Sequence, residues 1–174
     1  MLISKLRYCV IGIISHKYYM DFFLGDWVKI GNKEYCFNSN TLIWNDAKAF
    51  CMTEGGKLFE PRDATENSAV SEYAFNNGLN IFWFGIEDEP VSPEGTWVYA
   101  SDGSPLEYTN WNQGEPNNSG DEDCGEIGYF TGNLWNDYKC ATLLGSVCEK
   151  SGSPPPTTGG NFLYIRLQLH SSEI

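Results

Sequence analysis

The alternation of apolar and polar positions predicts a hairpin and a helix in the first half of the chain. In DWVKIGNKEYCFN, β-type residues stand on both sides of Gly31-Asn32, a turn signal, which predicts two short antiparallel strands. In WNDAKAFCMTEGGKL, apolar residues recur at helical spacing and the pattern ends at Gly55-Gly56. The apolar residues of this predicted helix are Trp44, Ala47, Phe50 and Cys51.

A second helix is predicted in DATENSAVSEYAFNNGL. Asp63 or Thr65 is suited to cap its first turn, and Gly78 is suited to end it. The residues expected to face the core are Ala69, Val70, Tyr73 and Ala74.

The second half of the chain predicts short strands and one long loop. IFWFGIED is almost wholly apolar, which indicates a strand buried on both faces. Further strands are predicted in TWVYAS, CGEIGYF, NLWNDYKC and GSVCEK. From Asp102 to Asn118 the chain is rich in Gly, Pro, Asn and Ser, which predicts a long loop of the kind that is usually functional or disordered. Two helices followed by strands indicate an α+β domain.

Length and composition fit one globular domain with short extensions. The chain has 174 residues, of which 41% are hydrophobic and 15% aromatic. We expect the domain at 25–150, a Pro/Gly/Ser/Thr linker at 151–160 and a tail of unknown structure at 161–174. Residues 1–24 form a leader with the features of a poor signal peptide or of an inaccurate gene start. No run is long enough to span a bilayer, so no membrane insertion is expected.

Charge and cysteine content narrow the function. The formal net charge of −12 argues against nucleic acid and favours a cation, or a neutral ligand reached through one. Six cysteines in a short chain indicate disulfides, and therefore a secreted or extracellular protein, rather than a cytosolic one with buried thiols. A zinc site is disfavoured because there is no CxxC, and both histidines, His16 and His170, lie in the extensions.

The most unusual stretch runs from Gln113 to Cys140. It gathers carboxylates that repel one another, interleaved with asparagines and bracketed in its second half by two cysteines. A solvated acidic loop is the simplest interpretation, but carboxylate and amide oxygens together suit a hard cation, Ca²⁺ more than Mg²⁺. The spacing is not that of an EF-hand. The acids are Glu115, Asp121, Glu122, Asp123, Glu126 and Asp137.

Four separate motifs resemble the C-type lectin domain family. EPN at 115–117, EDC at 122–124 and WND at 135–137, followed by Cys140, resemble its sugar-binding region. FWFGIED resembles its core strand and WNDAKAFCMTEGGKL its first helix, so the resemblance covers about Trp27 to Lys150. It implies a C-type lectin-like α+β fold with two helices, two small antiparallel sheets and a long calcium-binding loop.

The resemblance also implies two disulfides, Cys51–Cys148 and Cys124–Cys140. Cys36 has Cys9 as a candidate partner. If a signal peptide removes Cys9, Cys36 is left over, which allows an intermolecular bond and an oligomer.

The resemblance, transferred residue by residue, implies a principal Ca²⁺ site that also binds sugar. It also implies a cis peptide bond before Pro116, which would turn two ligands of the site toward one ion. Its residues are Glu115, Asn117, Glu122, Asn136 and Asp137. An auxiliary Ca²⁺ site, with Glu122 as a shared member, is implied at Asp88, Glu94, Asn118 and Asp123. Between Asp88 and Glu94 the spacing is longer than usual for the family.

The resemblance implies a non-enzymatic, calcium-dependent lectin for mannose-type sugars: mannose, N-acetylglucosamine, fucose and glucose. Vicinal equatorial hydroxyls of the sugar would bind the ion, donate hydrogen bonds to carboxylates and accept hydrogen bonds from Asn amides. The partners would be glycans on cell or microbial surfaces, as in pattern recognition or innate immunity. The alternatives are a domain of the same fold that binds protein, ice or mineral without sugar, and a glycosidase built on paired Glu residues.

Overall fold

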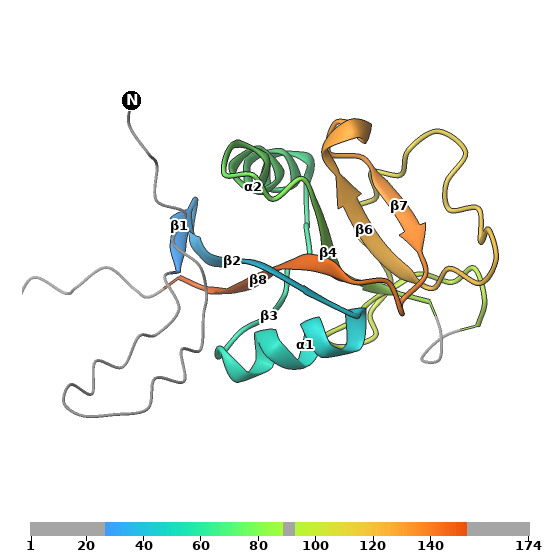
Figure 1. Ribbon diagram of the computed structural model, residues 1–174, viewed down its shortest axis with the longest axis horizontal. Coiled ribbons are helices and arrows are strands. Elements are labelled where there is room, and N and C mark those ends of the chain that lie inside the picture. The colour runs from blue at the N-terminus through green and yellow to red at the C-terminus, as the bar shows by residue number, and fades with distance from the viewer. Residues whose placement is uncertain (1–26, 89–92, 153–174) are drawn as a thin grey trace, which may run out of the picture.

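A computed structural model describes residues 27–88 and 93–152 of the chain (Figure 1). The expected leader and tail, most of the linker, and Cys9 lie outside the described residues. The predicted domain boundaries therefore stay predictions.

The described elements alternate short strands with two helices. In chain order they are β1 (Val28–Ile30), β2 (Lys33–Leu42), α1 (Trp44–Thr53), β3 (Lys57–Leu58), α2 (Ala64–Asn76), β4 (Ile81–Glu87), β5 (Val98–Tyr99), β6 (Cys124–Gly128), the 3-10 turn η1 (Tyr129–Thr131), β7 (Trp135–Tyr138) and β8 (Leu144–Ser151). Every predicted helix and strand is present. The two-residue strand β3 was not predicted, because it is too short to show any alternation.

The strands form one mixed sheet in the order β1-β2-β8-β4-β6-β7, with β3 beside β8 and β5 beside β4. Two groups of strands are visible in Figure 1, β1-β2-β8 and β4-β6-β7, with α2 above and α1 below the first group. We expected two small antiparallel sheets. The parallel pairing of Phe82 with Gly145 and of Trp83 with Ser146 joins them, so β4 belongs to both groups.

Helix α2 begins at the predicted residue, but the face that it turns toward the core differs from the predicted one. Asp63 is the N-cap, and its carboxylate accepts the Glu66 backbone N–H at 2.8 Å. Val70 and Ala74 are buried as expected, whereas Ala69 and Tyr73 are only half-buried. The polar residues Asn67 and Ser71 are buried in their place.

Strand β4 forms the centre of the core, as its apolar sequence predicts. Phe82, Trp83, Phe84 and Ile86 are completely buried. Around them lie two apolar clusters, one that includes Trp135 and one that includes the Cys51–Cys148 disulfide. The core therefore supports both helices and the strand that carries the WND motif.

Both disulfides implied by the resemblance are present, Cys51–Cys148 and Cys124–Cys140. Cys36 is also disulfide-bonded, and no cysteine of the described residues is free. The candidate pairing of Cys36 with Cys9 lies outside the described residues.

The two disulfides should differ in their effect on stability, because they close loops of different length. Cys51–Cys148 spans 97 residues and Cys124–Cys140 spans 16. In the chain-entropy model, replacing the first pair by Ala lowers the free energy of unfolding by about 4–5 kcal/mol, and replacing the second by about 3 kcal/mol. Urea unfolding of the two double variants measures both values. Equal losses would show that loop closure does not dominate.

Candidate metal and carbohydrate site

The long segment between β5 and β6 is attached to the core through Trp135, the first residue of β7. The rings of Tyr108 and Trp111 pack edge-on against the Trp135 ring, with centroids 5.4 and 5.6 Å away. The backbone of Trp135 donates to the Asn110 carbonyl and accepts from the Asn112 N–H, both at 2.8 Å. The loop is therefore fixed beside the strand that carries Asn136 and Asp137.

Strand register decides which side chains meet at this site. In β7, Trp135 and Asp137 are buried while Asn136 is half-buried, and Asn136 lies opposite Glu126 of β6. Gly125 lies opposite Asp137. A Cβ on Gly125 would come within 2.4 Å of the Ile86 side chain, so only glycine allows β6 to lie this close to β4.

The loop from 115 to 122 folds back onto β7. The Asn118 N–H donates to Asp137 Oδ2 at 2.6 Å, and the Glu122 N–H donates to Asn118 Oδ1 at 2.7 Å. The peptide bond between Glu115 and Pro116 is cis, as the resemblance implied, and the Asn117 amide donates to the Glu115 carboxylate. The structure thus brings Glu115, Asn117, Glu122 and Asp137 into one place.

Two carboxyl groups of this set are in direct contact. The pKa of Glu115 is raised, first by burial and then by a hydrogen bond with the Asp137 carboxyl group and by its negative charge. The charge of Glu122 raises this pKa further, and the Asn117 amide partly offsets the shift. Carboxyl groups this close need a shared proton or a cation between them.

Glu126 also lies at this site, although none of the sequence motifs assigns it a role. It is 6% exposed, its side chain hydrogen-bonds Asn136, and its pKa is raised to about 7, first by burial and also by the charge of Glu115. The sequence shows Glu126 in the acidic cluster. Only the β6–β7 register shows that it lies beside Asn136.

The donor set fits a hard cation. Asp137 Oδ1 is buried and has no hydrogen-bond donor among residues 27–88 and 93–152. A buried carboxylate oxygen without a donor costs free energy that a divalent cation would offset. The residues that could hold the ion are Glu115, Asn117, Glu122, Asn136 and Asp137, three carboxylates and two amides.

A second acidic cluster lies next to the first. One carboxylate oxygen each from Asp88, Glu94 and Asp123 lies within 4.8 Å of the others. Asn118 joins the second cluster, because its side-chain NH₂ donates to Glu94 at 2.9 Å. Its side-chain oxygen and its backbone N–H instead bond Glu122 and Asp137 of the first group. All four residues of the implied auxiliary site are therefore brought together. By contrast, Asp121 is exposed.

A family model for the Lectin C-type domain matches residues 40–150. The chain belongs to the C-type lectin domain family. Lectins of this kind bind glycans, generally depend on Ca²⁺ and are in general not enzymes. Within the described residues, no helix is long and apolar enough to cross a membrane.

Two curated lectin relatives illustrate the match. A perlucin-like protein of Mytilus galloprovincialis is 34% identical over 125 residues, which cover 70% of this chain and 79% of the relative. A CD209 antigen of Nomascus concolor is 34% identical over 131 residues, 74% of this chain and 31% of the relative. The chain thus spans about a third of the length of that CD209 antigen.

Solved lectin-fold structures agree with the architecture. The mouse scavenger receptor C-type lectin carbohydrate-recognition domain is 31% identical with a TM-score of 0.67, covering 75% of this chain and 97% of that one. A Ca²⁺-dependent type II antifreeze protein in its Ca²⁺-free form is 28% identical with a TM-score of 0.64, covering 72% and 98%.

The raised pKa of Glu126 predicts a pH-dependent stability of the calcium-free lectin domain. The proton that the folded state keeps contributes stability that is fully present below the usual Glu pKa of 4.5 and is lost as the pH rises through about 7. In EDTA, the free energy of unfolding of the wild-type protein should fall by about 2–3 kcal/mol between pH 4.5 and 8 because of this group. Glu126→Gln should not show this loss.

Urea unfolding at both pH values measures the difference between the two proteins. Asp121→Asn, a substitution at an exposed residue, is the control. Its free energy of unfolding should depend on pH as that of the wild-type protein does. Parallel slopes for wild type and Glu126→Gln would contradict the prediction.

Proposed function

We propose that this domain binds carbohydrate in a calcium-dependent manner through the site around Asp137. The observation that carries the proposal is the contact between the carboxyl groups of Glu115 and Asp137, with Asp137 Oδ1 buried and without a donor in the described part of the chain. Two carboxyl groups in contact repel each other when both are ionised, and a divalent cation between them would neutralise that repulsion. The match to the Lectin C-type domain supports calcium as this cation and carbohydrate as the ligand.

The side chains of the site have the hydrogen-bonding chemistry that a sugar diol requires. A bound Ca²⁺ would leave coordination positions open for two vicinal hydroxyl oxygens. The carboxylates of Glu115 and Glu122 would accept hydrogen bonds from these hydroxyls, and the amides of Asn117 and Asn136 would donate hydrogen bonds to their remaining lone pairs. The order Glu115 before Asn117 supports mannose-type sugars: mannose, N-acetylglucosamine, fucose and glucose.

The adjacent cluster of Asp88, Glu94, Asn118 and Asp123 is proposed as the auxiliary Ca²⁺ site. Because Asn118 contacts both clusters, an ion in the second would stabilise the loop that forms the first.

The partners we propose are glycans on cell or microbial surfaces, recognised outside the cell as part of pattern recognition or innate immunity. The cysteine pairs support secretion. Binding at one site should be weak, because each sugar hydroxyl is well solvated in water, so clustering of several domains would raise the avidity.

The second candidate is a domain of this fold that binds ice, mineral or protein without sugar. The structural similarity to a type II antifreeze protein supports this second candidate. Retention on a mannose resin that EDTA abolishes supports the lectin, and binding to other ligands that ignores both EDTA and free sugar supports the alternative. A glycan array with calcium and with EDTA identifies the sugar class.

Asp137→Asn should abolish the function without unfolding the protein. The change removes one negative charge from the crowded site and keeps an oxygen that can accept the Asn118 N–H. Calcium affinity should fall about 100-fold or more, with loss of mannose retention, because a ligand charge is lost. The calcium-free variant should be no less stable than wild type.

Asp121→Asn is the matched control, since the same chemical change is made in the same loop at an exposed residue. Calorimetric titration with Ca²⁺ measures both variants. Equal affinities would place the ion elsewhere, and no calcium heat with the wild-type protein would overturn the proposal.

Sugar should be released in mild acid. Protons compete with Ca²⁺ for the ligand carboxylates, and the raised pKa of Glu115 brings this competition closer to neutral pH. The calcium dissociation constant should rise at least about tenfold between pH 7.5 and 5.5. Calorimetry across this range checks it, and a constant affinity would be evidence against carboxylate ligands.

A further inference from the structure

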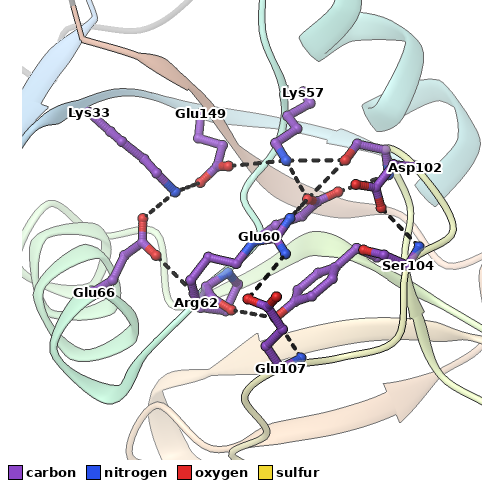
Figure 2. A network of polar contacts seen from close by, with 12 residues as sticks. Lys33, Lys57, Glu60, Arg62, Glu66, Asp102, Ser104, Glu107 and Glu149 are labelled. Atoms are coloured by element: carbon purple, nitrogen blue, oxygen red, sulfur yellow. Dashed lines mark hydrogen bonds and ion pairs between the residues drawn. The ribbon is translucent and has the colours of Figure 1, made fainter.

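A buried carboxylate outside the acidic loop lies at the centre of a polar network (Figure 2). Glu60, between β3 and α2, is 1% exposed. Its Oε1 accepts the Ser101 N–H at 2.8 Å, and its Oε2 accepts the Ser101 hydroxyl and the Arg62 guanidinium, each at 3.0 Å. The Lys57 ammonium also donates to Oε2. A buried charge is tolerated only when it is satisfied in this way.

The residues beside Glu60 contact the same neighbouring segment at two more points. The Tyr99 hydroxyl lies 3.3 Å from the Pro61 carbonyl and 3.3 Å from the Glu107 backbone N–H. The Arg62 guanidinium stacks 3.6 Å from the centre of the Tyr99 ring and lies 3.9 Å from the Glu107 carboxylate. Residues 60–62 therefore hold both ends of the segment 99–107.

That segment is the base of the loop that carries Glu115 and Asn117, two of the five proposed calcium ligands. Directly after Glu107 the chain packs on Trp135 and then reaches Glu115 and Asn117. The other three residues, Glu122, Asn136 and Asp137, lie on or immediately before β6 and β7. The two parts of the ligand set thus rest on different supports, and the distance between them depends on how the loop base is fixed.

We propose that Glu60 and Arg62 are positioning residues for the calcium and sugar site, because they fix the loop base that places Glu115 and Asn117 opposite Asp137. This inference rests on the proposed function. When the base is released, only part of the population has the loop in the binding position, and the apparent affinity falls in proportion.

Glu149 offers a matched control within the same network. It is 2% exposed and pairs with Lys33 at 3.1 Å and Lys57 at 3.5 Å. These contacts join β8 to β2 and β3. Lys57 also donates to the Ser101 hydroxyl at 3.1 Å, so Glu149 reaches the loop base only through Lys57, whereas Glu60 binds Ser101 directly. Glu60→Gln and Glu149→Gln therefore each remove one buried charge from the network, but only the first weakens the attachment of Ser101.

The experiment measures calcium affinity by calorimetry and hydrogen exchange without calcium for both variants. Glu60→Gln should raise the calcium dissociation constant about three- to tenfold, as expected if a third to a tenth of the molecules keep the loop in place. It should also speed exchange of the Ser101 and Glu107 amides. Glu149→Gln should stay within about twofold of wild type and leave these amides unchanged.

Ser101→Ala is a milder second variant at an exposed position, where folding is not at risk. It removes the hydroxyl that donates to Glu60 and accepts from Lys57, and it should weaken calcium binding in the same direction. Wild-type calcium affinity in Glu60→Gln, or an equal loss in Glu149→Gln, would overturn the proposal. No calcium heat in wild type would overturn the proposed function itself, while the exchange comparison would still support or overturn the role of Glu60 at the loop base.

Discussion

The burial of Trp135 connects the hydrophobic core to the acidic loop. Its ring packs against Phe84 of the central strand and against two aromatic residues of the loop, and its indole N–H donates to Asn67 of α2 at 2.8 Å. The next two residues are Asn136 and Asp137. Because one completely buried side chain contacts the helix, the sheet and the loop, the position of the polar pair is set by the core.

Buried carboxylates are stabilised in two different ways in this domain. Glu60 and Glu149 have lysine or arginine partners within 3.5 Å. Glu126 and Asp137 have no such partner among the described residues, and each has a buried oxygen without a hydrogen-bond donor. The first arrangement is complete as it stands and serves structure. The second is incomplete without a proton or a metal ion, which is typical of a functional site.

The elements with strong local signals could be predicted from the sequence, and the residues placed by long-range packing could not. The Asp63 cap and the wholly apolar β4 follow from local chemistry. The rotation of α2 does not, because Asn67 faces the core to accept a hydrogen bond from Trp135, 68 residues away. The joining of two expected sheets likewise depends on β4 pairing with β8.

The same distinction applies to the site. EPN, EDC and WND are contiguous motifs, so the sequence alone predicts one candidate site from their residues, and the structure brings these motifs close together. Glu126 lies among those acids in the sequence, but its place beside Asn136 follows only from strand register. The link from Glu60 to Ser101 crosses 41 residues and leaves no pattern in the sequence.

The separation of compensated from uncompensated carboxylates gives the domain an uneven electric field. Around Glu60 and Glu149 the charges nearly cancel, whereas the end near Asp137 keeps its negative charge. A field of this shape would attract divalent cations toward the loop from beyond contact distance, and dissolved salt would screen it within about 10 Å. If the loop binds a metal ion as proposed, the rate of binding would depend on the ionic strength of the solution as well as on the ligands.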